Sequence, residues 1–181
     1  MTSALVIIDM QQVMQDRIEA RRPHVNGDAP TKISGLATAF RDAGRPVIHV
    51  RHADPDPSSP LHPKASGYPP IPCAVERPGE AVFVKRSSSA FATTVLADHL
   101  RAQGLSHLYL VGAVAGFCVN STARAACDLG FRVTVVPDAV LGFDLPAAGL
   151  EAQTIFDVTM GLLAADFGEL RDSGAVLAQL G

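Results

Sequence analysis

Short runs made up mostly of apolar residues recur along the chain, and each run ends at a polar residue or a turn. The runs comprise residues 4–8, 46–50, 81–84, 107–111 and 131–136. Unbroken runs rich in valine and isoleucine are typical of strands that are buried on both faces of a parallel sheet. We therefore expect five strands in these positions and a short sixth strand at 167–170.

Apolar residues between the runs recur at helical spacing, and glycine or proline marks most of the ends. This pattern predicts helices at 11–22, 28–44, 90–103, 118–129, 149–165 and 172–180. The segment from His52 to Gly79 has eight prolines in 28 residues and no periodicity, which predicts a long functional or disordered loop. Strands that alternate with helices predict an open α/β fold with a mainly parallel sheet, and we expect one domain over residues 1–181.

Composition and charge exclude several classes of protein. With 181 residues, of which 48% are hydrophobic and 18% charged, the chain is expected to bury a core rather than to be disordered. The net charge of -3 and the scattered basic residues do not indicate a nucleic-acid partner. The first residues lack the basic segment of a signal peptide, and no apolar stretch reaches membrane-spanning length. We therefore expect a cytoplasmic protein without a membrane partner.

Four expected strands deliver polar side chains to one edge of the sheet. Asp9, Arg51, Lys85 and the loop that leads to Cys118 each follow the carboxyl end of a strand, and sites in open parallel sheets form at that edge. Each residue also has an ordinary structural interpretation. Asp9 could cap the next helix, Lys85 could be a solvated strand end, and Cys118 could be a small apolar core residue.

Cys118 is the candidate nucleophile of this group. In the first turn of its expected helix, free N–H groups and the helix dipole would lower the pKa of the thiol. A partly dry pocket would raise the pKa of Asp9, so that Asp9 could accept the thiol proton and return it to a leaving group. The Lys85 ammonium would stabilise both anions, and the N–H groups of residues 115–118 could form an oxyanion hole. This arrangement predicts a cysteine hydrolase that needs no histidine.

Four segments of the chain resemble the isochorismatase-like cysteine hydrolases, a superfamily that includes nicotinamidases, N-carbamoylsarcosine amidases and isochorismatases. The segments are 5–11, 84–91, 111–123 and 130–139, and they occur in the order and at the spacing of the family. The resemblance implies a doubly wound, six-stranded sheet of order 3-2-1-4-5-6 with helices on both faces, and an Asp9–Lys85–Cys118 catalytic triad. It also implies that the protein is a homodimer or homotetramer.

The resemblance further implies a cis peptide bond between Val114 and Ala115, which would turn the backbone N–H groups of Ala115 and Cys118 toward the oxyanion. The chain departs from the family pattern at Ala115 and Gly116, where threonine and an acid are usual. It departs again at 12–14, where Gln-Val-Met replaces Asn-Asp-Phe. We expect the loss of a hydroxyl contact and a more open pocket wall, with the triad unaffected.

The sequence says less about the substrate and a bound metal than about the catalytic triad. Nicotinamidases of this superfamily carry a metal, and His52, Asp54 and His62 are metal-competent residue types. Their context does not match that motif, and a proline-rich loop would hold ligands poorly, so we expect neither metal nor cofactor. Arg51 or Arg86 could bind a substrate carboxylate. The side chains expected to line the pocket for a small-molecule substrate are Gln11, Arg51, Phe91, Val114 and Phe117.

The presence of Cys118 favours hydrolysis of a C–N bond in a small-molecule amide. Cys118 would attack, Asp9 would protonate the departing ammonia or amine, and water would then cleave the thioester. Two alternatives stay open: a vinyl-ether hydrolase of the isochorismatase type, and a non-catalytic or redox-sensing protein with the same fold. Activity that survives Cys118→Ala would favour the first, and oxidation of Cys118 without turnover would favour the second.

Overall fold

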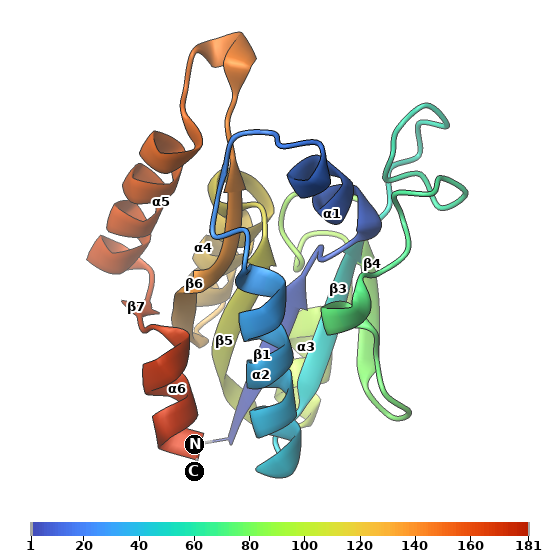
Figure 1. Cartoon of the computed structure of the whole chain (residues 1–181). Helices are drawn as coiled ribbons and strands as arrows, with labels where there is room; N and C mark the ends of the chain where they lie inside the picture. Colours follow the sequence, from blue (N-terminus) through green and yellow to red (C-terminus); the bar gives the residue numbers. More distant parts are fainter. Residues whose placement is uncertain (1, 181) are drawn as a thin grey trace.

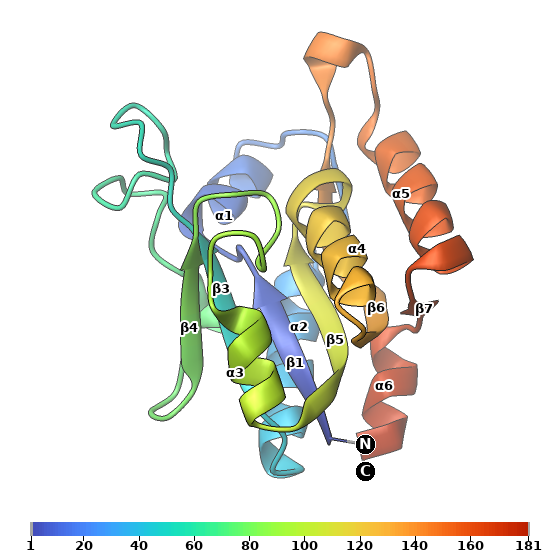
Figure 2. The ribbon, with the colours of Figure 1, turned by 180° about the vertical axis from the view of Figure 1, so that it is seen from behind.

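The computed structural model describes residues 2–180 and shows a twisted central sheet covered by helices on both faces (Figures 1 and 2). Its strands are β1 (Thr2–Ile8), β2 (His24–Val25), β3 (Val47–His52), β4 (Ala81–Lys85), β5 (Leu105–Ala113), β6 (Arg132–Phe143) and β7 (Glu169–Leu170). The sheet order is β2-β6-β5-β1-β3-β4, and β7 also pairs with β6. All pairs are parallel except β2 with β6. Without β2, the order is the expected 3-2-1-4-5-6, which confirms the predicted fold class.

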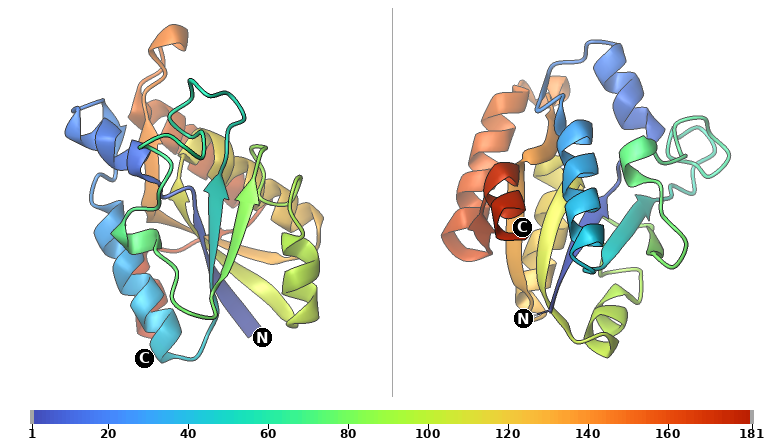
Figure 3. Two further views of the ribbon diagram at one scale, coloured as in Figure 1. Left: turned by 90° about the vertical axis from the view of Figure 1, so that its right-hand side faces the viewer. Right: turned by 60° about the horizontal axis from the view of Figure 1, so that its bottom comes forward.

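The helices divide between the two faces of the sheet, as the side view on the left of Figure 3 shows. Their bounds are α1 (Gln12–Glu19), α2 (Ala29–Asp42), α3 (Leu96–Ala102), α4 (Asn120–Asp128), α5 (Ala152–Asp166) and α6 (Ser173–Leu180). Helices α1, α2 and α6 pack on one face, and α3, α4 and α5 pack on the other. Within residues 2–180, no helix is long and apolar enough to cross a membrane.

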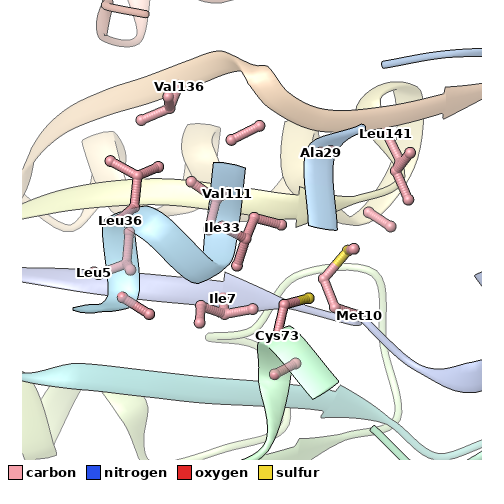
Figure 4. Close-up of a cluster of buried hydrophobic side chains, with 14 of the residues drawn as sticks. Leu5, Ile7, Met10, Ala29, Ile33, Leu36, Cys73, Val111, Val136 and Leu141 are labelled. Atoms are coloured by element: carbon pink, nitrogen blue, oxygen red, sulfur yellow. The ribbon is translucent and has the colours of Figure 1, made fainter. Parts of the chain in front are cut away.

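Strand β1 lies at the centre of the sheet and contributes to both cores. Leu5 and Ile7 pack against α2 in the cluster of Figure 4, whereas Val6 and Ile8 belong to the cluster on the opposite face. Successive side chains of a strand point to opposite faces, so an unbroken apolar run is buried on both. The central strands therefore fix the carboxyl edge of the sheet on which the candidate site is built.

Strand β6 continues past Pro137, where the sequence predicted that it would end. Its register on β5 shifts between Val135 and Val140, so that extra residues bulge out of the ladder. The Asn26 amide donates hydrogen bonds to the carbonyls of Pro137 (3.0 Å) and Val140 (2.9 Å). Because a side chain from another segment holds the bulge, the strand passes a proline that would otherwise stop it.

Helix α3 begins at Leu96, six residues later than the sequence predicted. Hydroxyl groups compete for the backbone donors in the preceding segment: Thr93 Oγ1 accepts from the Arg86 amide (3.0 Å), and Thr94 Oγ1 accepts from the Leu96 amide (3.1 Å). Serine and threonine favour such local bonds over a helix. The segment between β4 and α3 is therefore a series of turns.

The proline-rich loop is anchored to the segment that follows β1. Gly67 and Pro69 accept hydrogen bonds from the amides of Val13 (3.0 Å) and Gln12 (2.8 Å), and the Ile71 amide donates to Met10 O (3.0 Å). A short 3-10 helix, Pro72–Ala74, then packs against α2. The end of this loop therefore lies beside the residues that carry the candidate site.

Candidate active site

Asp9 turns the chain sharply at the carboxyl end of β1. Its φ angle is 51°, in the left-handed region that only glycine, asparagine and aspartate adopt at low cost. The Asp9 amide still donates to Val50 O (2.9 Å), so the turn begins on the sheet itself. The carboxylate is 2% exposed. The backbone thus holds a buried acid in a left-handed turn, a conformation that is uncommon for residues other than glycine.

Lys85, the last residue of β4, carries a fully buried ammonium group. A charge in that position is stable only when it is paired and hydrogen-bonded. Its Nζ lies close to four acceptors, which are Asp9 Oδ2 (2.8 Å), His52 Nδ1 (2.9 Å), Ser87 O (3.0 Å) and Cys118 Sγ (3.2 Å). The ammonium therefore joins the acid, the thiol and a histidine into one cluster.

Cys118 lies in a π-helical turn, Ala115–Val119, that precedes α4. The sequence predicted the first turn of a regular helix instead. In this turn the amides of Phe117 and Val119 both donate to the carbonyl of Val114, at 3.0 and 3.3 Å. The Cys118 side chain is half-buried, with its sulfur directed to the Lys85 ammonium.

Gly112 allows this turn to lie beside Asp9. A Cβ atom at this position would lie 2.1 Å from Ile8 O, and the φ angle of 119° disfavours any other residue. Gly112 pairs in register with Ile8, the residue before Asp9. The close approach of β5 to β1 thus brings the thiol segment to the acid.

The cis peptide bond implied by the resemblance is displaced by one position. It joins Ala113 to Val114 and not Val114 to Ala115. The sequence offers no proline that would mark the bond, so its exact position had no local signal.

Burial controls the protonation of both acidic groups in the cluster. Burial raises the pKa of Asp9, and the Lys85 ammonium opposes this effect. Burial and the Asp9 carboxylate raise the pKa of the Cys118 thiol to about 12, again opposed by Lys85. The expectation that the helix start lowers the pKa of the thiol is therefore wrong, because desolvation and a neighbouring negative charge outweigh the dipole. Burial thus favours the neutral thiol, and the Lys85 ammonium favours the thiolate.

Two polar residues expected to line the pocket, Gln11 and Arg51, do not contact the Lys85 ammonium. Gln11 is buried and bonds only to backbone groups of His52 and Tyr68. Arg51 pairs with Glu76, because alternation along β3 directs it away from the face that His52 occupies. The structure therefore does not bring Arg51 to the cluster.

The three apolar residues expected to line the pocket, Phe91, Val114 and Phe117, differ in how far they are buried. Phe91 stacks on Phe131 with ring centroids 5.8 Å apart and belongs to the core, and Val114 packs against the core of the opposite face. Phe117 is 51% exposed and precedes Cys118 directly. Of the five candidates, Phe117 is the one whose side chain is exposed. Arg86 is exposed.

His52 belongs to the cluster, although the sequence grouped it with Asp54 and His62 as a metal-competent loop residue. It is the last residue of β3 and pairs in register with Lys85. The signal that could have found it is the same that found Asp9 and Lys85: a polar residue at the carboxyl end of a strand. The predicted strand ended at Arg51, so His52, the last residue of β3, was assigned to the loop.

Three groups of this cluster are also possible metal ligands. An oxygen of Asp9, a ring nitrogen of His52 and the sulfur of Cys118 lie within 4.8 Å of one another. These are ligand types of zinc sites. The Lys85 ammonium, however, lies within hydrogen-bond distance of all three, so the side chains present fit a tethered cation between them.

Gly116, where an acid is usual in the resembling family, does not open the pocket wall. A Cβ atom at this position would lie 2.8 Å from Cγ2 of Ile155 on α5. Ala115 is fully buried beside it. The space that a larger side chain would need is occupied by α5, which corrects the expectation of a more open wall.

Comparisons with known proteins show the family to which this chain belongs. Residues 3–159 match the family model of the isochorismatase domain. The chain is 34% identical over 178 residues to the secreted isochorismatase effector Isc1 of Verticillium dahliae, which covers 94% of this chain and 88% of that protein. It is 32% identical over 145 residues to the streptothricin hydrolase of Streptomyces noursei, covering 80% of this chain and 51% of that protein.

Two further similarities concern an amidohydrolase and a solved structure. Ureidoacrylate amidohydrolase RutB of Variovorax paradoxus is 25% identical over 189 residues, covering 86% of this chain and 74% of that protein. A solved structure from Chromobacterium violaceum, assigned to the hydrolases of the isochorismatase family, matches with a TM-score of 0.92 at 32% identity. The match covers 99% of this chain and 94% of that one.

Proposed function

Because this chain belongs to the isochorismatase family of hydrolases, we propose that it cleaves the C–N bond of a small-molecule amide, with Cys118 as the nucleophile. The observation that carries the proposal is the Lys85 ammonium, which lies 2.8 Å from the Asp9 carboxylate and 3.2 Å from the Cys118 sulfur. A buried cation between an acid and a thiol stabilises whichever of the two is negative. The amidohydrolases and the streptothricin hydrolase among the relatives support an amide as the substrate.

The first step is the attack of Cys118 on the amide carbonyl. The thiol proton passes to Asp9 as the sulfur bonds to carbon, and the carbonyl electrons move to oxygen. The raised pKa of both groups suits this transfer, because neither holds its charge well without a partner. The ammonium of Lys85 compensates the negative charge throughout.

The oxyanion requires donors that are not already bonded. The amides of Phe117 and Val119 are engaged by Val114 O, which leaves those of Ala115, Gly116 and Cys118. Of these, the family resemblance implies the backbone N–H groups of Ala115 and Cys118 as the oxyanion hole. Donors of this kind stabilise the tetrahedral intermediate more than the substrate.

The second half of the reaction releases the enzyme. Protonated Asp9 gives its proton to the departing ammonia or amine, and a thioester of Cys118 is left. Asp9 then accepts a proton from water as the water attacks the thioester carbon, and it returns this proton to the sulfur as the carbon–sulfur bond breaks and the carboxylic acid leaves, which restores the thiol. One carboxyl group thus acts as base and acid in each half of the reaction, for which a pKa above its ordinary value is suited.

The experiment that tests this proposal is a screen for ammonia release from small carboxamides and ureido compounds, ureidoacrylate among them, with the full chain. We expect release by the wild type, loss of release by Cys118→Ala, and a thioester adduct of Cys118 in the intact mass. The matched control is Cys127→Ala, because Cys127 contacts Asp166 O and lies outside the cluster. Release that survives Cys118→Ala would overturn the proposal, and turnover of a vinyl ether by that variant would show ether hydrolysis instead.

A further inference from the structure

His52 is held at the site by hydrogen bonds to its backbone. The Gln11 side chain accepts from the His52 amide (2.8 Å) and donates to the His52 carbonyl (3.0 Å). The same Gln11 amide nitrogen donates to Tyr68 O (2.8 Å), and Gln11 is fully buried. A side chain that bonds both the N–H and the C=O group of another residue fixes the backbone position of that residue. The end of β3 is therefore joined to the turn after β1.

The imidazole of His52 is directed to Lys85. Its Nδ1 atom lies 2.9 Å from Lys85 Nζ. A lysine ammonium has donors only, so Nδ1 must supply the lone pair. The ring is then neutral and carries its hydrogen on Nε2. A protonated ring would present an N–H to the ammonium and lose this bond.

We propose that His52 is a positioning residue for Lys85, whose ammonium it holds between Asp9 and Cys118 by accepting a hydrogen bond at Nδ1. The inference rests on the proposed function, because it assigns His52 a role in the same cysteine chemistry. It departs from the triad in adding a fourth side chain, and Gln11 as the support of that side chain.

The surroundings of His52 keep the ring in the required form. The groups that act on it are Lys85, from β4, Asp9, from the turn after β1, Asp54, from the loop that follows β3, and the backbone of Ser87, from the turn after β4. Burial and the Lys85 ammonium lower the pKa of His52, and Asp9, Asp54 and the Ser87 backbone oppose this to a smaller extent. His52 therefore remains a neutral acceptor at pH 7.

The role of His52 in the thiol chemistry follows from what Lys85 does. The Lys85 ammonium is the group that lowers the pKa of the Cys118 thiol against burial and Asp9. An ammonium that leaves its place would raise that pKa and slow every reaction of the thiolate. His52 is thus expected to affect the sulfur without touching it.

A first experiment measures the protonation of His52 directly. The full chain is labelled with 15N at its six histidines. Long-range 1H–15N spectra then report the tautomer and pKa of each ring, and the His52→Asn variant identifies the signal of His52. We expect the hydrogen of His52 on Nε2 at pH 7, and a higher pKa of His52 in Lys85→Met, where the neighbouring cation is absent. A hydrogen on Nδ1 at pH 7, or a pKa unchanged by Lys85→Met, overturns the proposal.

A second experiment measures the thiol. Iodoacetamide labelling of Cys118 at pH 8, mapped by peptide mass spectrometry, is compared in the wild type, His52→Leu and His52→Asn. Leucine removes the acceptor, and the asparagine Oδ1 atom restores one near the position of Nδ1. We expect labelling to slow about tenfold or more in His52→Leu, as for the loss of a hydrogen bond to a charged group, and to stay within about threefold of the wild type in His52→Asn.

Two controls make the result specific. His62→Asn changes a histidine of the loop that follows β3, whose ring accepts from the Lys64 amide, and the labelling of Cys118 in this variant should match the wild type. Labelling of Cys127 should be equal in all variants, which shows that the fold is intact. Wild-type labelling of Cys118 in His52→Leu overturns the proposal even if Cys118 is the nucleophile. Ammonia release by Cys118→Ala would overturn the proposed function, whereas the coupling of His52 to Lys85 would still be read from the spectra.

Discussion

Replacement of Lys85 by methionine is expected to destabilise the fold, and to do so more at high pH than at low pH. Methionine fills a similar volume but leaves the Asp9 carboxylate buried without its cation. The two largest influences that lower the pKa of Asp9 are the charge of Lys85 and the hydrogen bond from it. Without them, the pKa of Asp9 in the folded state rises further above its ordinary value. Removal of one partner of a buried ion pair costs about 3–5 kcal/mol.

The sign of the pH effect follows from proton binding. In Lys85→Met the folded state holds a proton on Asp9 that the unfolded chain releases above about pH 4. Stability is therefore lost as the pH rises from the unfolded pKa toward the folded pKa, by about 1.4 kcal/mol for each pH unit in that interval. The variant should be close to the wild type near pH 4 and furthest from it at pH 8.

The assay is urea unfolding at pH 5, 6, 7 and 8, followed by circular dichroism because the chain has no tryptophan. Lys32→Met is the control, since Lys32 makes partly exposed ion pairs with Asp28 and Asp138 and should change stability by less than about 1 kcal/mol at every pH. The double variant Asp9→Asn with Lys85→Met removes the titrating group, so its difference from the wild type should depend less on pH. If Lys85→Met lost the same free energy at pH 5 and pH 8, the account of a buried charge pair would be refuted.

Three further substitutions test other parts of the structure. Gly112→Ala places a Cβ atom 2.1 Å from Ile8 O, so thermal unfolding should show a loss of about 2 kcal/mol or more and slower labelling of Cys118; an unchanged midpoint would refute the close approach of β5 to β1. Gly116→Asp should likewise lower the melting temperature, because Ile155 on α5 occupies the space; a compensating Ile155→Ala that failed to restore stability would contradict this. The Glu80 carboxylate accepts hydrogen bonds from the side chains of Arg41 and His49 and from the Arg77 amide. Burial raises the pKa of Glu80, but these bonds outweigh it and lower the pKa to about 2. Its contribution is present above the unfolded pKa and lost toward pH 2, so Glu80→Gln should destabilise the protein at pH 7 by about 1–3 kcal/mol and much less at pH 2.5; equal losses at both values would refute the assignment.

The sheet could be predicted because each strand is marked by a short run of neighbouring apolar residues. The apolar runs that became β1 and β5 are buried on both faces, and a run of that kind has few other stable uses in a soluble chain. The carboxyl edge then followed from parallel pairing, and with it the proximity of Asp9 and Lys85. The long loop and the turn after β1 carry no such pattern, and their mutual hydrogen bonds are visible only in the folded chain.

The thiol environment could not be predicted in the same way. Helix position favours a low pKa for Cys118, but the sign is decided by how much water the folded site excludes and by where the Asp9 charge lies. Both depend on side chains that are distant in sequence. The position of His52 beside Lys85 could not be predicted either, because the Gln11 side chain that bonds its backbone is 41 positions away in the sequence.

The surroundings of the Lys85 ammonium have a consequence for the motion of the site. The group has three hydrogens and four acceptors within reach, so one acceptor is always left without a hydrogen. Rotation about the bond between Cε and Nζ exchanges the hydrogens without moving any heavy atom, and a small tilt changes which acceptor is left out. In the proposed reaction, when negative charge passes between the Asp9 oxygen and the Cys118 sulfur, the lysine follows it by reassigning its hydrogens. Within this cluster the charge transfer therefore needs only the reorientation of one ammonium group at the edge of the sheet.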